Sequence, residues 1–367
     1  MAGWSVYDGP MKKAKRIPAL ALSLLLPALA LAVQANAASG GAAPGRMEHE
    51  AWRLELDNDL FISSDNGISA GASLQWQSAA ALDWGSLRGA SRLQRGIGRL
   101  LAIRRDSGWV CRTGLAVSQL MQTPNDLTRS DLIREDVPYA GALTVRAGWY
   151  AYHDQAFRGF ELTLGVAGPL SMAERSQKAI HRLFHLVRPM GWDNQLGNEL
   201  LLNLDLTGKR KIWRAGDRSG ASCDLALGGD LALGNLFTLA AATLELRAGH
   251  NLPGGFVPLP DPVGLTMLQA AVLDPVRPGA ASIHGFLVLR GMALARMLFL
   301  DGNTFRASHS VERRPYAAVL AAGLDLDFRR WGAGFYVMNS TPLVKGSLAP
   351  GAERRVSLAG LHLTLRI

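Results

Sequence analysis

Residues 199–206 read Glu-Leu-Leu-Leu-Asn-Leu-Asp-Leu, and this stretch decides between the possible folds. Leucine occupies every even position, while most odd positions carry an acid or an amide. Strict alternation predicts a β-strand with one apolar and one polar face. The pattern recurs at residues 224–233 and 361–367. A soluble sandwich would turn the apolar face inward, whereas a transmembrane barrel turns it toward lipid and keeps the polar face in the lumen.

The rest of the chain contains further segments of this type. Strands are predicted at residues 50–60, 68–78, 110–120, 141–152, 158–167, 198–208, 221–233, 236–249, 283–299, 314–328, 332–340 and 355–367. Their number is even, and most are near the ~10 residues that a tilted membrane strand needs. The predicted fold class is therefore all-β, an antiparallel transmembrane β-barrel of about 12 strands with a short α-helix in an extracellular loop.

The N-terminus has the layout of a secretory signal peptide. A basic cluster, Lys12 to Arg16, precedes an apolar run at residues 17–33, and Ala35 and Ala37 supply the small residues of a cleavage site. Residues 1–37 are predicted to be this signal, with residues 1–10 as an upstream start extension. Residues 38–367 then form a single barrel domain in the bacterial outer membrane. No later stretch has the eighteen or more apolar residues of a membrane helix.

The charge and cysteine content of the chain limit which binding partners and which disulfide can be expected. The chain has 39 basic and 30 acidic residues, and removing the signal peptide leaves a mild basic excess with no basic block. Nucleic acid is therefore not expected as a partner, whereas an anionic membrane surface is compatible. No protein partner is evident. Cys111 and Cys223 fall on strands that are not neighbours, so no disulfide is predicted.

Four long polar segments join the predicted strands, at residues 79–109, 121–138, 168–197 and 250–282. Barrels of this class place long loops outside, so all four are expected there. In the third, Ser171 and Glu174 fit the N-cap and N3 positions of a capping box, which predicts a helix running to about Val187. The spacing of Gln177, His181 and His185 would then place these three side chains on one side of the helix.

Several polar clusters are candidates for chemistry. Residues 56–61 and 64–71 are rich in Asp and Asn, whose oxygens suit Ca²⁺ but which also form ordinary hairpin turns. A second cluster comprises residues 122–126, Arg129 and residues 136–141. A third combines the predicted helix with residues 191–196. Neither the serine-hydrolase elbow nor the His-Glu-x-x-His zinc motif occurs.

Taken in order, these clusters resemble the lipid A 3′-O-deacylases of Gram-negative outer membranes. The matching positions lie between residues 50 and 200. They are Asn58 and Asp59, Ser69, Thr123-Pro124 with Arg129, residues 136–141, Gly168-Pro169 with Gln177 and His181, and residues 192–195. The sequence departs from the family pattern in four places. Ser69 replaces a threonine, Arg129 a lysine, Ile68 a tyrosine and Val137 an arginine.

The resemblance implies a twelve-stranded barrel that hydrolyses an ester of lipid A in lipopolysaccharide, releasing its 3′-linked acyloxyacyl group with the help of Ca²⁺. It implies His181 as the general base, since histidine changes protonation near neutral pH. Asp59 and Asn58 would bind the metal, and Arg129 or Ser69 would help to stabilise the oxyanion. Arg129 could instead bind a lipid phosphate.

Two points remain open from the sequence. Neighbouring residues on a regular strand face opposite sides, so Asn58 and Asp59 can share one site only if the strand ends or bulges there. Two other functions also fit the same pattern. One is a catalytically decayed or porin-like structural barrel, and the other is an outer-membrane phospholipase.

Overall fold

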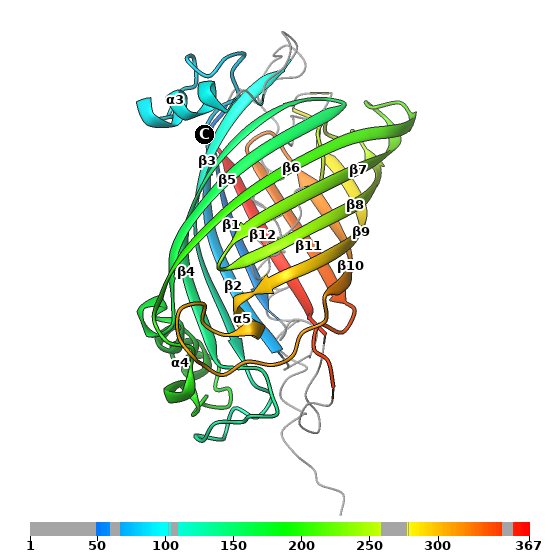
Figure 1. The fold of residues 1–367 in the computed structure, drawn as a ribbon. Helices are drawn as coiled ribbons and strands as arrows, with labels where there is room; N and C mark the ends of the chain where they lie inside the picture. Colours follow the sequence, from blue (N-terminus) through cyan, green and yellow to red (C-terminus); the bar gives the residue numbers. More distant parts are fainter. Residues whose placement is uncertain are drawn as a thin grey trace, which may run out of the picture.

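The computed structural model describes residues 49–58, 67–101, 103, 109–257, 277, 279–346 and 355–367, with only the backbone described at 67–70. Twelve strands form a closed antiparallel barrel in which each strand pairs with its neighbours in the chain and β12 closes on β1 (Figure 1). The strands are β1 Ala51–Asn58, β2 Gly67–Gln77, β3 Val110–Thr123, β4 Ala140–His153, β5 Ala156–Ala167, β6 Glu199–Gly216, β7 Ala221–Gly234, β8 Phe237–His250, β9 Ser282–Met297, β10 Tyr316–Asp327, β11 Trp331–Ser340 and β12 Ser357–Arg366.

All twelve predicted strands are confirmed, and β6 shows the largest difference in length. The sequence places its end near residue 208, where leucines give way to Lys209 and Lys211, yet the strand continues to Gly216. Both lysines point into the lumen, where Lys209 forms an ion pair with Glu245 and Lys211 lies 2.9 Å from Asp224. Acids on β7 and β8 therefore neutralise a segment whose local sequence is unlike a membrane strand.

The two faces of the wall have opposite polarity, as the sequence predicts. On β6, Leu200 and Leu202 are 78% and 52% exposed on the outside. The alternate residues Asn203 and Thr207 are buried in the lumen. Leucine side chains toward lipid and polar side chains inside are the arrangement of a transmembrane barrel.

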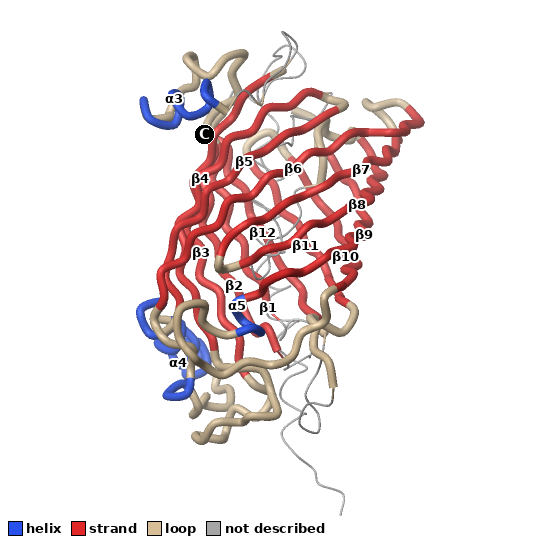
Figure 2. The backbone as a smooth tube through the Cα atoms, viewed as in Figure 1, coloured by secondary structure: helices blue, strands red, loops and turns tan. Residues whose placement is uncertain are grey.

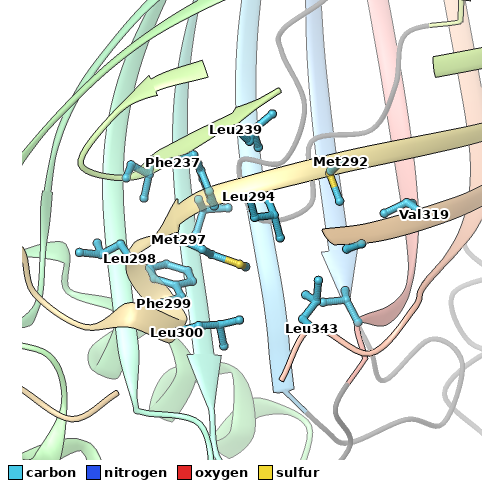
Figure 3. Close-up of a cluster of buried hydrophobic side chains, with 14 of the residues drawn as sticks. Phe237, Leu239, Met292, Leu294, Met297, Leu298, Phe299, Leu300, Val319 and Leu343 are labelled. Atoms are coloured by element: carbon cyan, nitrogen blue, oxygen red, sulfur yellow. The ribbon is translucent and has the colours of Figure 1, made fainter. Parts of the chain in front are cut away.

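The lumen is filled with side chains and with inserted backbone. From one end, residues 251–257 enter the barrel, and the Phe256 ring packs 6.2 Å from that of Phe157 on β5. At the other end, α5 (Leu298–Asp301) follows β9 and lies in an apolar cluster (Figure 3). Gln122, on the opposite side of the ring in β3, donates from Nε2 to the Phe299 carbonyl at 2.7 Å. The end of the barrel that carries α5 is therefore bridged from wall to wall.

The two ends of the barrel differ in what they carry (Figures 1 and 2). The "terminus end" carries the start of β1, the C-terminus and α3 (Arg92–Leu100). The "loop end" carries α4 (Ala173–Leu183), α5, the connections 124–139, 168–198 and 298–315, and residues 341–346. Because the number of strands is even, both ends of the barrel chain lie at the terminus end, which faces the periplasm in bacterial barrels of this type, so the loop end faces outward.

The prediction that all four long segments lie outside is wrong for two of them. Residues 79–109 follow β2 and residues 250–282 follow β8, and both strands run toward the terminus end. The first of these segments contains α3, a helix that the sequence reading missed. Its N-terminus has a capping box, with Gln94 N donating to Ser91 Oγ and Ser91 N donating to Gln94 Oε1. Two of its nine residues are glycines, whose low helix propensity makes the segment look non-helical in the sequence.

Both cysteines are free, as expected for residues on β3 and β7. Within the described residues, no helix is both long and apolar enough to cross a bilayer. The predicted signal peptide at residues 1–37 lies outside the described residues and stays a prediction.

Candidate functional site

The loop-end edge of the wall brings the predicted site segments together. Asn58 pairs with Ala70, Ala70 with Met121, and Met121 with Gly141. One row across β1 to β4 therefore joins the first two of the sequence clusters. Ser69 is the extra residue at a register shift between Ile68 and Ala70, which is a β-bulge.

Helix α4 lies against the outer side of this row. On β3, exposed Leu115 and Val117 face lipid, and Gln119 and Met121 continue the same alternation toward the loop end. Gln119 donates from Nε2 to the Ser171 carbonyl at 2.7 Å, just before the helix. Met121 is buried in a cluster with Ala173, the first residue of α4. The helix therefore lies outside the barrel wall, beside the outer edge of its lipid-facing surface (Figure 1).

The start of α4 differs from the prediction. Ser171 closes a short 3-10 turn, η2 (Pro169–Ser171), and its hydroxyl donates to the Gly168 carbonyl at 2.6 Å. The N-cap is Met172, in the left-handed conformation at φ 57°, and no side chain caps the helix. Glu174 forms an ion pair with Lys178 instead of completing a capping box. Because Ser171 and Ala173 fit against Gly141, contact with the wall decides where the helix begins.

The helix also ends earlier than predicted, at Leu183 rather than near Val187. His185 adopts φ 56°, and Leu186 N donates to the His181 carbonyl at 2.8 Å. These features form a Schellman C-cap, which reverses the chain at His185. The prediction that His185 shares a helix face with Gln177 and His181 is therefore wrong. His181 is the only histidine on the helix.

The hydrogen bond of His181 fixes the state of its ring. Nδ1 lies 2.5 Å from the Val187 carbonyl, which can only accept, so Nδ1 carries the proton. In the neutral ring this leaves the Nε2 lone pair free to take a proton. A cavity of about 230 Å³ adjoins the ring and is lined by His181, Lys178, Arg182, Leu186 and Arg188. The arrangement suits a base acting on a substrate that carries negative charge.

The basic residues of this cavity are functional candidates that the sequence reading missed. Lys178 and Arg182 lie on the same helix as His181, and Arg188 comes from the chain that follows the reversal at His185. The i, i+4 spacing of Lys178 and Arg182 was available in the sequence. The contribution of Arg188 depends on the Schellman turn, which the predicted longer helix left out.

Gln177 anchors the helix that carries His181. It is 3% exposed, and its Oε1 accepts a hydrogen bond of 2.7 Å from the indole Nε1 of Trp192. Trp192 is fully buried in the 3-10 helix η3 (Trp192–Asn194) and packs 5.1 Å from the ring of Tyr139. Burial raises the pKa of Tyr139 to about 12. Two matched sequence clusters therefore form a scaffold beneath the helix.

The segment before β4 has a supporting role as well. Asp136 accepts hydrogen bonds from the backbone N–H groups of Asn125 (2.9 Å) and Val137 (2.7 Å), and its burial raises the pKa of its carboxyl. These bonds hold the loop 124–139 against the strand entry. Met190 N donates to the Leu127 carbonyl at 2.9 Å, which ties the same loop to the chain after α4.

Arg129 lies in this loop, and its contacts are local. Its Nε donates to Asp131 Oδ1 at 3.0 Å, and this pairing lowers the pKa of the Asp131 carboxyl. Both side chains are exposed, so the pair contributes little to stability. No interaction between Arg129 and Asn58 or His181 is found among the described residues. To stabilise the oxyanion as predicted, the Arg129 guanidinium would have to leave Asp131 and contact the substrate.

Few of the oxygen atoms that could bind Ca²⁺ at this site belong to described residues. β1 is described as far as Asn58, and the conformation at Asp59, on which the sequence requirement for a strand end or bulge depends, lies outside the described residues. Asp59 and the side chain of Ser69 lie outside what the structure describes. Within the described part of the chain, no three His, Cys, Asp or Glu residues form a metal-binding group. A Ca²⁺ site here would be held by the Asp59 carboxylate and the Asn58 amide, whose oxygens are hard donors that suit this ion.

Gly141 allows a test of the contact between helix and wall. A Cβ at this position would collide with Ala173 Cβ and Ser171 Oγ. We expect Gly141→Ala to displace α4 and to lower any activity that depends on His181 by about 10²-fold, because a displacement near 1 Å misaligns the reacting groups. Gly291→Ala on β9 is the control, since nothing lies within 4 Å of its Cβ position. Equal rates for the two variants would show that the position of α4 does not matter.

Comparison with known proteins identifies the family. The family model "Outer membrane protein LpxR" matches residues 20–356. The solved structure of LpxR from Salmonella typhimurium aligns with a TM-score of 0.66 at 11% identity, covering 86% of this chain and 100% of that one.

The other comparisons give no further information about the family of this chain. The β domain of the Bordetella autotransporter BrkA aligns with a TM-score of 0.39 at 10% identity, over 89% of this chain and 99% of that one. The search of curated proteins found no match. The family match spans most of the sequence and agrees with the twelve-stranded barrel, so this chain belongs to the LpxR family of outer-membrane proteins.

Proposed function

We propose that this protein is a Ca²⁺-dependent esterase that removes the 3′-linked acyloxyacyl group from lipid A. The observation that carries the proposal is the place of His181, on a helix outside the barrel wall at the loop end, with a free Nε2 beside a basic cavity. Lipid A lies in the outer leaflet, so its acyl chains would extend along the exposed leucines while its phosphates meet Lys178, Arg182 or Arg188.

In the proposed reaction, His181 Nε2 takes a proton from water as the water oxygen bonds to the ester carbonyl carbon. The bond between that carbon and the sugar oxygen then breaks. The imidazolium returns its proton to the leaving alkoxide, so the products are a sugar hydroxyl and a fatty acid. Ca²⁺ held by Asp59 and Asn58 would supply positive charge to stabilise the developing oxyanion. Arg129 or the Ser69 hydroxyl adds a donor there.

The filled lumen argues against the porin-like alternative. Arg247 on β8 donates from Nε to Asp224 at 2.9 Å, and both are 2% exposed inside the barrel. With Gln122 bonded to the Phe299 carbonyl across the loop end, the described interior is packed rather than an open channel.

The test is mass spectrometry of lipid A from cells with and without the protein. We expect loss of the mass of the 3′-linked acyloxyacyl group only when the protein is present. Unchanged lipid A with new lysophospholipid would identify a phospholipase instead. If neither lipid changes, the barrel is structural or its site has decayed.

Substitutions of Arg129 test whether its positive charge or the geometry of its guanidinium matters for activity. Lysine stands at this position in the pattern that the sequence resembles, so Arg129→Lys should retain more of the deacylation rate than Arg129→Ala. The reason is that lysine keeps the positive charge but loses the planar fork. Rates measured on purified lipid A decide the point. Equal loss in both variants would mean that a guanidinium-specific contact has replaced the lysine contact.

A further inference from the structure

A second cavity lies on the outside of the wall at the terminus end, away from α4. Its volume is about 540 Å³, and its lining includes Trp109, His153, Arg158, Gly208, Arg210 and Leu227. Arg158 and Arg210 follow the alternation that points the leucines of β5 and β6 outward. The cavity therefore opens toward the membrane rather than into the lumen.

Its depth coincides with the edge of the apolar band. On β6 the outward residues are leucines at every even position from Leu200 to Leu206, then Gly208 and Arg210. Closer to the terminus end, Trp213 is 51% exposed, as are Trp52 (42%) and Trp331 (45%) near the same end of their strands. Exposed tryptophans mark the level of the lipid headgroups. The cavity thus lies where acyl chains meet headgroups in the inner leaflet.

The two arginines flank a gap in the wall surface. Arg158 pairs in register with Gly208, and Ala156 with Arg210, so the two guanidinium side chains are diagonal neighbours on one face. An added Cβ on Gly208 would meet only the Phe157 carbonyl, 4.0 Å away. The glycine therefore leaves open space between two cations.

The other groups around the cavity make it suitable for binding an anion. The Arg158 guanidinium lies 5.4 Å from the centroid of the Trp109 ring, which also packs edge-on against His153 at 4.8 Å. His153 Nδ1 accepts from Gln155 N at 3.1 Å, so its other nitrogen, Nε2, carries the proton and can donate. Asp154, the nearest acid in sequence, is already bound by Arg214, Arg218 and Lys211. Among the described residues, neither Arg158 nor Arg210 forms an ion pair.

We propose that this cavity binds the headgroup of an anionic phospholipid of the inner leaflet. Arg158, Arg210 and His153 would donate to its phosphodiester, Trp109 would form one side of the site, and the acyl chains would lie along Leu206 and its neighbours. A zwitterionic phosphatidylcholine presents a competing ammonium, whereas phosphatidylglycerol does not. The site is separate from the proposed lipid A site, which is at the other end of the barrel.

The experiment measures lipid selectivity. The folded, purified protein is placed in phosphatidylcholine bilayers containing trace spin-labelled phosphatidylglycerol or phosphatidylcholine, and the motionally restricted fraction gives their relative association. We expect a preference of about tenfold for phosphatidylglycerol, from two arginines acting at the membrane surface. The Arg158→Gln, Arg210→Gln double variant should lose it. Gly208→Leu should lose it too, because it fills the cavity without changing charge.

The control is the double variant Arg92→Gln, Arg99→Gln, which removes two exposed arginines of α3 at the same end of the barrel. It should keep the preference. An equal loss in this control would mean that general surface charge, not the cavity, selects the lipid, and no preference in the wild type would also overturn the proposal. A gel shift between boiled and unboiled samples confirms that each variant folds, because a closed strand network resists unfolding.

Discussion

His181→Ala should lower the rate of lipid A hydrolysis by about 10²–10⁴-fold, the usual contribution of a positioned general base. The ring is held by its bond to the Val187 carbonyl, with Nε2 left to accept the proton of water. Alanine removes that acceptor. The barrel should be unaffected, because α4 packs on the outside of a wall whose strand pairing does not involve it. Rates on purified lipid A with Ca²⁺, together with the gel shift on boiling, separate the two effects.

His185→Ala is the matched control, four residues away in the same segment. His185 is exposed and directly follows the C-cap residue Phe184, where its backbone reverses the chain, and its side chain has no role in the proposed reaction. Its variant should keep nearly the full rate. A dead His185→Ala enzyme beside an active His181→Ala enzyme would refute the mechanism while leaving the family intact.

Removal of Ca²⁺ should abolish hydrolysis, and Asp59→Ala should do the same with the metal present. Alanine removes the one charged ligand of the proposed site and leaves the neutral Asn58 amide, and Ca²⁺ sites depend on ligand charge. Calorimetry should detect Ca²⁺ binding to the wild-type protein and much weaker binding to the variant. This second measurement tests the metal site independently of catalysis.

Asp126→Ala is the control variant, because it removes another carboxylate at the loop end that is not proposed to bind Ca²⁺. The Asp126 carboxylate accepts from Thr128 Oγ1 at 2.6 Å and from Thr128 N at 3.0 Å within its own turn, and these hydrogen bonds lower its pKa. Its variant should bind Ca²⁺ normally and keep its activity. Full hydrolysis by the wild type in excess chelator would remove Ca²⁺ from the proposed mechanism.

Local sequence determined most of the barrel. Each strand shows period-two alternation, and that pattern depends only on which side chains face lipid and which face the lumen. The exception is the extended half of β6, where Lys209 and Lys211 continue a membrane strand only because Glu245 and Asp224 lie on neighbouring strands. The capping box of α3 was also present in the sequence, hidden by glycines that lower helix propensity.

The candidate site was predictable as a set of segments but not as an arrangement. The clusters around Asn58, Arg129 and His181 were recognised from their order, and the row from Asn58 to Gly141 shows that the strand ends of the first two clusters are neighbours. The predicted metal and catalytic roles of Asn58, Asp59, Ser69, Arg129 and His181 remain predictions. Where α4 begins depends on the fit of Ala173 against Gly141, a contact between residues far apart in the chain.

The sequence by itself thus determined the barrel, its strand count and the segments at its outer edge, because alternation and motif order are properties of neighbouring residues. Only the tertiary structure decided that α4 lies outside the wall, that His185 leaves the helix, and that Phe256 and Phe299 enter the barrel from opposite ends. These features depend on packing between segments that are distant in the chain. No local periodicity encodes such contacts, because their free energy arises only once the wall has closed.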